Sequence, residues 1–306
     1  MRIRIKILLK RNRTIYFLYR YAGGFIKPLL GIINGMNSKD YSKRLLVTAG
    51  KKARLKGNYA EPDGKPEKAA SKKELEKHIE ETYRLQHVMY AENKHAVLIV
   101  LQGMDTAGKD STIQHVMRGL NPQGCSVTSF KVPTPEELDH DFLWRIEAAV
   151  PRIGEFGIFN RSHYEDVVMP KVHKTLPTAV IEKRYGQINE FEKTLSENGT
   201  TILKFFLHIS KEEQKKRLLE RINDPTKNWK MNPQDMKERE LWDRYMEAYE
   251  EALNKCSKPH APWYVIPSEH KWLRNLSVSQ IIVDKLESLD MKYPKVKYSK
   301  KDMVII

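Results

Sequence analysis

The chain has 306 residues, of which 30% are charged and 40% are hydrophobic. This length and balance are typical of one large α/β domain with insertions, and they exclude a short chain held together by disulfides. With two cysteines, Cys125 and Cys256, and no His or Cys pair at zinc-ligand spacing, we predict a protein of the reducing cytoplasm. The formal net charge of +15 favours a polyanionic ligand, such as a nucleotide or a nucleic acid.

Much of that charge lies in the first 35 residues, which hold eight Lys or Arg and no acidic residue, and the rest of the chain carries +7. Arg20 and Lys27 interrupt the apolar residues of this segment, so we predict neither a stable membrane span nor a secretory signal. Two interpretations remain open. Either Met36 is the true start, or residues 1–35 form a basic amphipathic extension that touches a membrane surface.

Residues 36–70 are predicted to be an N-terminal arm or linker, because Gly, Pro and charged residues dominate their second half. Ser71 and Glu74 form a capping-box pattern, which predicts the start of a helix that ends near Asn93. The pattern then changes to the continuous apolar run AVLIVLQ at 96–102. Such a run is expected of a strand buried on both faces of a parallel sheet.

Apolar strands and amphipathic helices alternate along the rest of the chain. The further predicted strands are residues 125–132, 156–160, 201–209 and 263–267. The predicted helices between them are residues 109–119, 135–149, 178–197 and 270–289. This alternation predicts an α/β fold with a doubly wound, parallel five-stranded sheet flanked by helices, in a domain spanning 71–290 that is followed by a tail at 291–306.

A long and highly charged insertion, residues 210–255, separates the fourth predicted strand from the fifth. Ser210 and Glu213 form a second capping-box pattern at its start. The pair Asp224-Pro225 breaks this helix, and a second helix begins near Pro233. We therefore expect a helical unit of its own between these two strands.

The segment GMDTAGKDST (103–112) lies between the first apolar strand and a helix, and it matches the G-x-x-x-x-G-K pattern of a phosphate-binding loop. Its glycines let successive backbone N–H groups point at phosphate oxygens, and the helix N-terminus adds a favourable dipole. Lys109 is placed to bridge the outer phosphates. The predicted phosphate-binding residues of this loop are Gly103, Ala107, Gly108, Lys109, Asp110 and Ser111. The chain is thus predicted to be a P-loop phosphotransferase.

The loop departs from the usual pattern at one position. Asp110 follows Lys109, where such loops usually carry the Ser or Thr that binds Mg²⁺. Asp105 is then the obvious carboxylate for a metal, and we predict that it acts as a Mg²⁺ ligand or general base, the alternative being an Asx turn that shapes the loop. For Asp110 we predict a cap on the helix N-terminus, where the helix dipole favours a carboxylate.

A second polar segment, IFNRSHYEDV (158–167), follows the third apolar strand. Ligands of open parallel sheets bind beyond the carboxyl ends of the strands, so this segment should face the phosphate loop. Arg161 suits bidentate contact with a phosphoryl group, and Asn160 offers an oxygen to metal-bound water. Glu165 or Asp166 would complete a metal site. The alternatives are that Arg161 pairs with Glu165 and that one of the two acids caps a helix.

Together, GMDTAGKDS, GLNPQGCSVTSFKVPTPEELDHDFLWR (119–145) and FNRSHYED resemble the two phosphate-site motifs and the connecting segment of the polyphosphate kinase 2 family. The resemblance continues through residues 204–230 and ends near 261–272, so that it covers about residues 40–290. The motif SHYE is similar to the corresponding motif of the class III branch, whose members phosphorylate both AMP and ADP.

This resemblance implies phosphoryl transfer between inorganic polyphosphate and AMP or ADP, or GMP or GDP, in an enzyme that forms homodimers or homotetramers. It implies Mg²⁺, with Mn²⁺ as the alternative, held by Asp105 together with Asp166 or Glu165. Lys109 and Arg161, with Asn160 beside them, would steady the transferred group.

The resemblance also implies that the 210–255 insertion is a lid. Its predicted phosphate contacts are Arg217 and Arg221, spaced i, i+4 on one helix, with Lys227 and Lys230 beyond the turn. The predicted nucleotide contacts are Arg118, Asn121, Lys131, Arg145 and Glu165.

Two other functions compete with this prediction. An ATP-dependent nucleoside monophosphate kinase would share the fold and the lid, but GKD in place of GK[ST] and the basic lid favour polyphosphate. A basic nucleic-acid-binding P-loop protein would explain the sequence pI of about 9.5. The chain shows no surface motif of interleaved aromatic and basic residues, so we predict no nucleic-acid partner.

Overall fold

The computed structural model describes residues 6–7, 17–18, 38–48, 52–55 and 67–296. The basic extension 1–35 for the most part, much of the predicted arm 36–70 and the end of the predicted tail lie outside these residues. The predicted domain boundaries therefore stay predictions. Near the N-terminus, β1 (Lys6–Ile7) and β2 (Phe17–Leu18) form a two-stranded antiparallel pair.

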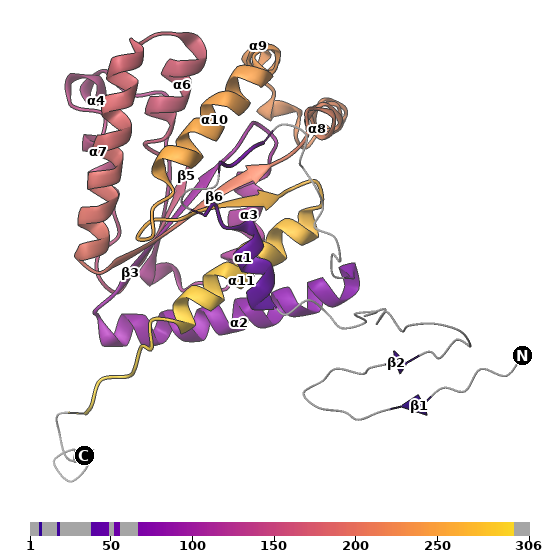
Figure 1. The fold of residues 1–306 in the computed structure, drawn as a ribbon, viewed down its shortest axis with the longest axis vertical. Helices are drawn as coiled ribbons and strands as arrows, with labels where there is room; N and C mark the ends of the chain where they lie inside the picture. The colour runs from indigo at the N-terminus through magenta and orange to yellow at the C-terminus, as the bar shows by residue number, and fades with distance from the viewer. Residues whose placement is uncertain (1–5, 8–16, 19–37, 49–51, 56–66, 297–306) are drawn as a thin grey trace, which may run out of the picture.

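A five-stranded parallel sheet with strand order β4–β5–β3–β6–β7 lies at the centre of the fold (Figure 1). Its strands are β3 (Ala96–Gln102), β4 (Cys125–Ser129), β5 (Phe156–Asn160), β6 (Thr200–His208) and β7 (Trp263–Pro267). The five predicted strands are thus confirmed, although β4 is shorter than predicted. Every residue of β3 is buried, because β3 pairs with β5 on one side and β6 on the other and helices cover both faces.

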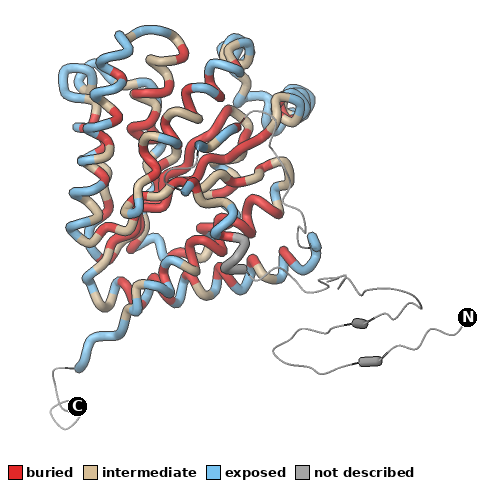
Figure 2. Tube along the Cα trace, viewed as in Figure 1, coloured by how far each residue is buried: buried red, intermediate tan, exposed pale blue. Residues whose placement is uncertain are grey.

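Helices form a layer on each face of this sheet (Figure 1). One layer contains α1 (Ser38–Leu45), α2 (Lys68–Glu92), α3 (Lys109–Val116) and α11 (Lys271–Glu287). The other contains α6 (Glu165–His173), α7 (Thr178–Glu197) and α10 (Trp242–Cys256). Buried residues concentrate in the strands and in α11 (Figure 2), which lies between α2 and the sheet. The predicted doubly wound fold is confirmed.

The first predicted capping box is wrong. Helix α2 begins at Lys68, so Ser71 lies inside the helix, where its Oγ donates to the Glu67 carbonyl at 2.8 Å. Ser71 is also buried, at 2% exposure, because it lies on the face of α2 that packs inward. The hydroxyl therefore bonds back to the preceding turn instead of capping a helix end.

The predicted helix 135–149 is in fact two short helices, α4 (Pro135–Asp139) and α5 (Trp144–Glu147). A capping box that the sequence analysis missed, between Thr134 and Glu137, starts α4. Residues 140–143 separate the two helices, and Ile146 of α5 is fully buried in the core.

The predicted insertion 210–255 contains α8 (Lys211–Asn223), the 3₁₀ turn η2 (Asn228–Lys230), α9 (Pro233–Glu240) and α10. Ser210 caps α8, because its Oγ accepts from the Glu213 N–H at 3.0 Å. Helix α10, in contrast, buries Trp242, Met246 and Tyr249 in the core. Within the insertion, residues 211–240 contribute no side chain to the main apolar cluster, although Gln214, Arg217 and Leu218 of α8 are buried.

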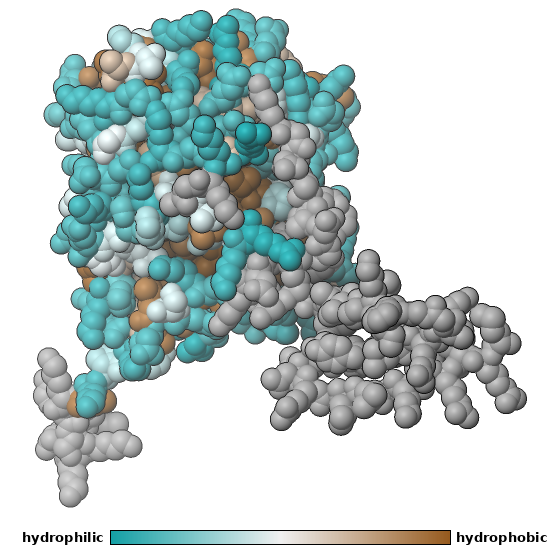
Figure 3. Space-filling view, viewed as in Figure 1, coloured by the Kyte–Doolittle hydropathy of each residue, from teal (hydrophilic) through white to brown (hydrophobic). Residues whose placement is uncertain are grey.

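Cys125 and Cys256 are both free thiols. Among the helices of the described residues, none has the length and apolar character that crossing a bilayer requires. The face of the domain seen in Figure 3 is mostly hydrophilic, with small scattered apolar areas.

Candidate active site

The phosphate loop connects the carboxyl end of β3 to the start of α3, as the sequence predicted. Inside it, the Lys109 ammonium donates to the carbonyls of Gly103, at 2.6 Å, and Met104, at 3.3 Å. Burial lowers the pKa of Lys109 and the Arg161 cation lowers it further, whereas Asp105 and Glu165 raise it. Lys109 is therefore a partly desolvated cation next to the amides of the loop. A phosphate bound there would offset its positive charge.

Two glycines of the loop have φ angles that side chains disfavour, +149° for Gly103 and +106° for Gly108. A Cβ on Gly103 would lie 2.6 Å from the Leu207 carbonyl oxygen, and one on Gly108 would overlap the guanidinium of Arg274. Glycine at these positions thus allows both the curl of the loop and the close approach of two neighbouring elements.

We expect Gly108→Ala to lower the free energy of unfolding by about 2 kcal/mol, because the added methyl displaces Arg274 and strains the loop. Urea unfolding of the variant and the parent chain measures this change. Gly186→Ala is the matched control: Gly186 lies in α7 with nothing near its missing Cβ, so that variant should be neutral or stabilised by up to about 1 kcal/mol. Equal stabilities for the two variants would contradict the proposed contact.

Two buried arginines hold the outer side of the loop. Arg217 of α8 donates to the carbonyls of Thr106, at 2.9 Å, and Ala107, at 3.3 Å, and its Nη2 donates to the Ser268 carbonyl at 2.6 Å. Its Nε donates to Glu213 at 2.7 Å. All of these donors bond protein oxygens, so Arg217 supports the shape of the loop in this structure. Its phosphate contact stays a prediction.

The second of these arginines, Arg274 of α11, is fully buried and was not predicted as a site residue. It donates to Ser111 Oγ at 3.0 Å and, at 3.5 Å, to the Ala107 carbonyl. Burial, with a contribution from Arg217, lowers its pKa to about 10. Its neighbours in α11, Leu273 and Asn275, are buried as well, but the sequence alone gives no signal that Arg274 faces the loop.

Arg161 lies beside the loop, as the strand order requires: β5 pairs with β3, so their carboxyl ends are adjacent. Its Nη2 donates to Asp105 Oδ1 at 3.0 Å. Burial disfavours its charge, but Glu165 and Asp105 hold the pKa of Arg161 above its ordinary value. The predicted pairing of segment 158–167 with the loop is confirmed, and Asp105 is the acidic partner that hydrogen-bonds Arg161.

Glu165, at the start of α6, belongs to the same group of charges. Burial raises the pKa of Glu165, while Arg161 and Lys109 lower it. The Gln102 side chain lies between Glu165 and Ser162 and, with its amide oriented to satisfy both, donates to Glu165 Oε1 at 2.9 Å. The loop, the end of β3 and the start of α6 thus share one electrostatic cluster.

Asp166 has different neighbours from Asp105. Its Oδ2 lies 3.6 Å from Arg145 Nη2, and its carbonyl accepts from Arg184 at 2.7 Å. Burial raises the pKa of Asp166, and Arg145 lowers it. Nowhere in the described residues do three or more His, Cys, Asp or Glu side chains form a group that could hold a metal ion. The structure does not assemble the predicted ligands Asp105 and Asp166 into such a group.

Asp110 does not cap α3, since the N-cap residue is Gly108 and no side chain bonds the free N–H groups there. Its Oδ1 instead accepts from Asn160 Nδ2 at 2.7 Å, and its Oδ2 lies 3.8 Å from Lys230 Nζ. The exposed Asp110 carboxylate thus connects α3, the end of β5 and the η2 turn of the insertion.

The other predicted cations of the insertion also have acidic neighbours. Arg221 lies 3.5 Å from Asp235 Oδ2 and Lys227 pairs with Asp224. Trp229, next to Lys230, is 73% exposed and its ring lies under the Lys230 ammonium. Arg217 and Arg221, predicted to face one anion together, therefore have separate partners.

The four predicted nucleotide contacts on the β4 side divide into two groups. Arg118 and Asn121 precede β4 and lie toward the amino end of the sheet, where Arg118 pairs with Glu76 and Asn121 caps a 3₁₀ turn, η1 (Pro122–Gly124). Lys131 and Arg145 follow β4 at the carboxyl end, and Arg145 donates to the Lys131 carbonyl at 2.9 Å. The structure brings this second pair, and not the first, to the edge that carries the phosphate loop.

The model of the polyphosphate kinase 2 family matches residues 65–294, which is most of the chain. The chain belongs to the polyphosphate kinase 2 family. It is 54% identical over 222 residues to an AMP/ADP-polyphosphate phosphotransferase of Meiothermus ruber, covering 72% of this chain and 83% of that protein. An ADP-polyphosphate phosphotransferase of Rhodopseudomonas palustris is 47% identical over 232 residues, covering 72% and 80%. The predicted resemblance is thus confirmed.

A solved structure supports the fold independently. The crystal structure of polyphosphate kinase 2 from Arthrobacter aurescens superposes with a TM-score of 0.82 at 42% identity, covering 86% of this chain and 94% of that one. Family membership and this likeness make the chain a kinase of the P-loop type.

Proposed function

We propose that the chain transfers phosphoryl groups between inorganic polyphosphate and AMP or ADP, forming ADP or ATP, and that GMP and GDP are further acceptors. The carrying observation is the phosphate loop with Lys109 inside it and the Arg161–Asp105 pair, 3.0 Å apart, beside it. The names of the Meiothermus and Rhodopseudomonas relatives support both acceptors.

Phosphoryl transfer needs alignment and charge neutralisation more than covalent chemistry. In this proposal the loop amides from Gly103 to Ser111 bind the polyphosphate end. Lys109 releases the two loop carbonyls and, with Arg161, neutralises the equatorial oxygens of the transferred group. Asn160, tied to Asp110 at 2.7 Å, keeps the end of β5 next to the loop.

For the metal, the residues present fit Mg²⁺ with few protein ligands. Mg²⁺ is commonly held by one or two carboxylates together with substrate phosphates, and Asp105 offers a partly exposed carboxylate at the loop. Asp105 would be the main ligand, Asp166 or Glu165 would assist, and Mn²⁺ is the alternative ion. The metal supplies neutralisation of phosphate charge; Arg161 shares the Asp105 carboxylate and so orients it.

For the acceptor nucleotide we propose Lys131, Arg145 and Glu165, because these residues lie at the carboxyl edge of the sheet. Residues 211–240 would act as the lid, with Arg221, Lys227 and Lys230 exchanging their present acidic partners for polyphosphate. The homodimeric or homotetrameric state and the cytoplasmic location stay predictions.

The activity is tested by incubating the full chain with Mg²⁺, polyphosphate and AMP or ADP without ATP. We expect ADP from AMP and ATP from ADP, measured by nucleotide chromatography. A parallel reaction with AMP and ATP, but no polyphosphate, tests the competing monophosphate kinase. Product in that reaction alone would overturn the proposal.

The nucleic-acid-binding alternative is tested by RNA binding at several salt concentrations, with the full chain and with residues 36–306. Tight, salt-sensitive binding by the shorter chain, with no phosphoryl transfer, would favour that alternative.

A further inference from the structure

The turn between β5 and α6 has a backbone conformation that needs support. Arg161, the first residue of this turn, has a φ angle of +63°. This value lies in the left-handed region, which residues other than Gly, Asn and Asp rarely adopt. The same residue aims its guanidinium at Asp105 of the phosphate loop. Strained backbone of this kind persists where the surroundings over-determine it, and it is concentrated at functional sites.

The three residues that follow Arg161 are all buried, at 0% or 1% exposure, and each contacts another element. Ser162 Oγ lies 3.1 Å from the side-chain amide of Gln102 at the end of β3. His163 Nε2 lies 3.2 Å from Glu192 Oε1 of α7, and the Tyr164 hydroxyl donates to the same oxygen at 2.9 Å. Two consecutive side chains of the turn therefore share one buried carboxylate.

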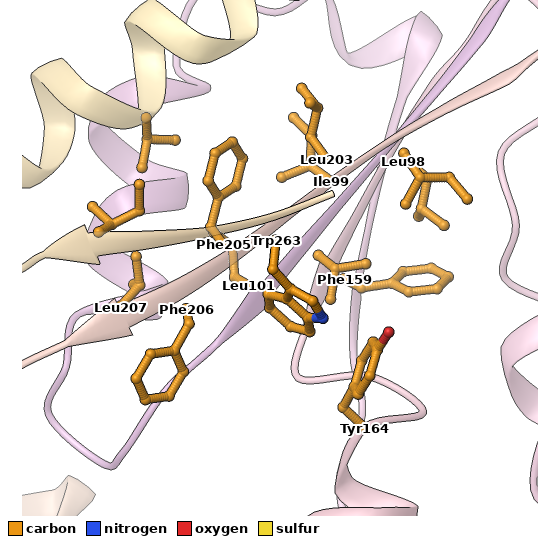
Figure 4. Close-up of a cluster of buried hydrophobic side chains, with 14 of the residues drawn as sticks. Leu98, Ile99, Leu101, Phe159, Tyr164, Leu203, Phe205, Phe206, Leu207 and Trp263 are labelled. Carbon is orange, nitrogen blue, oxygen red and sulfur yellow. The ribbon is translucent and has the colours of Figure 1, made fainter. Parts of the chain in front are cut away.

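A buried lysine completes this network from the other side. Lys204, in the middle of β6, donates to Glu192 Oε2 at 2.5 Å, to the Tyr164 hydroxyl at 2.8 Å and to the Cys256 carbonyl at 2.8 Å. Figure 4 shows the Tyr164 ring beside Trp263, among the apolar side chains of the sheet, and the two ring centroids are 4.7 Å apart. Hydrogen bonds thus connect the β5–α6 turn to α7 and β6 directly, and to α10 through Lys204.

A gain in stability does not explain why Lys204 and Glu192 are buried together. Lys204 and Glu192 have 0% side-chain exposure, and the neighbours of Lys204 in β6 are apolar. Two charges taken out of water lose hydration free energy that their attraction only partly returns, and well-packed apolar side chains are often as stable or more so. Unlike an apolar core, the Lys204–Glu192 pair forms directional, charge-assisted hydrogen bonds, and these fix the position of the Tyr164 side chain.

We propose that the Lys204–Glu192 pair is a positioning device for Arg161: through Tyr164 and His163 it holds the turn so that the guanidinium stays beside the phosphate loop. The pair touches no substrate, so its members are positioning residues. This inference rests on the proposed role of Arg161 in phosphoryl transfer.

The test replaces the network with apolar side chains in one step, Tyr164→Phe, Glu192→Leu and Lys204→Met, so that neither charge nor the hydroxyl is left unpaired. His163 Nε2 and the Cys256 carbonyl each lose one partner, so we expect the triple variant to fold but to unfold somewhat below the temperature of the parent chain. Its kcat should fall about 30-fold while KM for polyphosphate and ADP changes less than about 3-fold. The matched control is Tyr185→Phe, which alters another buried tyrosine, in α7 like Glu192. This variant should retain the parental kcat. Parental kcat in a folded triple variant would overturn the inference.

A double-mutant cycle then separates positioning from general damage. In an Arg161→Ala background, the triple substitution should lower kcat by less than about 2-fold further, because the residue it positions is absent. A full additional 30-fold loss would overturn the inference while leaving the role of Arg161 intact. Parental kcat in Arg161→Ala itself would instead refute the proposed role of Arg161.

If the triple variant fails to fold, Tyr164→Phe alone carries the test, since it removes one hydroxyl and leaves the ion pair in place. We expect about a 5-fold loss of kcat in the parent chain and less than a 2-fold loss in the Arg161→Ala background. Equal losses in the two backgrounds, or no loss in the first, would overturn the inference.

Discussion

Lys109→Met is expected to lower kcat for polyphosphate-dependent ADP phosphorylation about 10³-fold, which corresponds to about 4 kcal/mol of transition-state stabilisation. The loop places this ammonium against the Gly103 and Met104 carbonyls, where burial lowers its pKa. Phosphate oxygens would replace those carbonyls as partners. Methionine retains most of the length of the side chain and removes the charge, so the loss reports electrostatics more than packing.

The measurement is steady-state kinetics with polyphosphate and ADP, together with thermal unfolding of the same sample. Lys193→Met is the matched control, because Lys193 is an exposed lysine near the end of α7 and lies outside the proposed site. It should retain kcat within about 2-fold. If Lys109→Met is folded and retains more than about a tenth of the parental kcat, Lys109 does not have the proposed role.

Asp105→Asn is expected to lower kcat by about 10²-fold or more without loss of the fold. The substitution keeps the size of the side chain and removes the carboxylate that pairs with Arg161 at 3.0 Å and is proposed to bind the metal. The backbone of residue 105 remains held by Gln214, whose Nε2 donates to its carbonyl at 3.1 Å. The loop should therefore retain its shape while its charge balance changes.

Two measurements distinguish the metal from the ion pair. If Asp105 binds the metal, the Mg²⁺ concentration for half-maximal activity should rise about 10-fold or more in Asp105→Asn. If Asp105 only orients Arg161, kcat should fall with an unchanged Mg²⁺ requirement. Asp139→Asn, at an exposed residue ending α4, is the control and should change neither quantity. Near-parental kcat would remove Asp105 from the mechanism.

The phosphate loop and the strands could be predicted because both depend on residues close together in the chain. The run 96–102 is apolar throughout, as a strand covered on both faces requires, and it is followed at once by Gly103 and the rest of the loop. Parallel pairing then brings Arg161 to the loop, since neighbouring strands end at one edge. These features follow from local composition and one rule of topology.

The contacts of the residues that surround the phosphate loop were harder to predict. Arg217 was expected to reach phosphate, but its donors bond carbonyls of the loop and of residues 268–269, which lie far away in sequence. Arg274 was not expected, because nothing near it in the chain resembles a phosphate motif. Whether an arginine faces an anion or a protein carbonyl depends on which backbone oxygens the fold places around it.

Arg118 and Asn121 show a related limit. They are close in sequence to Lys109, yet α3 runs from the carboxyl edge of the sheet toward the amino edge, so they follow the end of α3 that is farther from the phosphate loop. The predicted helix 270–289 was nearly correct, but periodicity does not say that Gly108 of the loop would lie against its Arg274.

By itself, the sequence determined the class of fold, the family and the position of the glycine-rich loop that we propose binds phosphate, because apolar periodicity, glycine placement and short motifs act locally. Tertiary structure decided which charges meet: Asp105 with Arg161, Asp166 with Arg145, and Lys204 with Glu192 inside the core. The physical reason is that a side chain's charge is a property of its type, whereas its burial and its partner depend on elements distant in the chain.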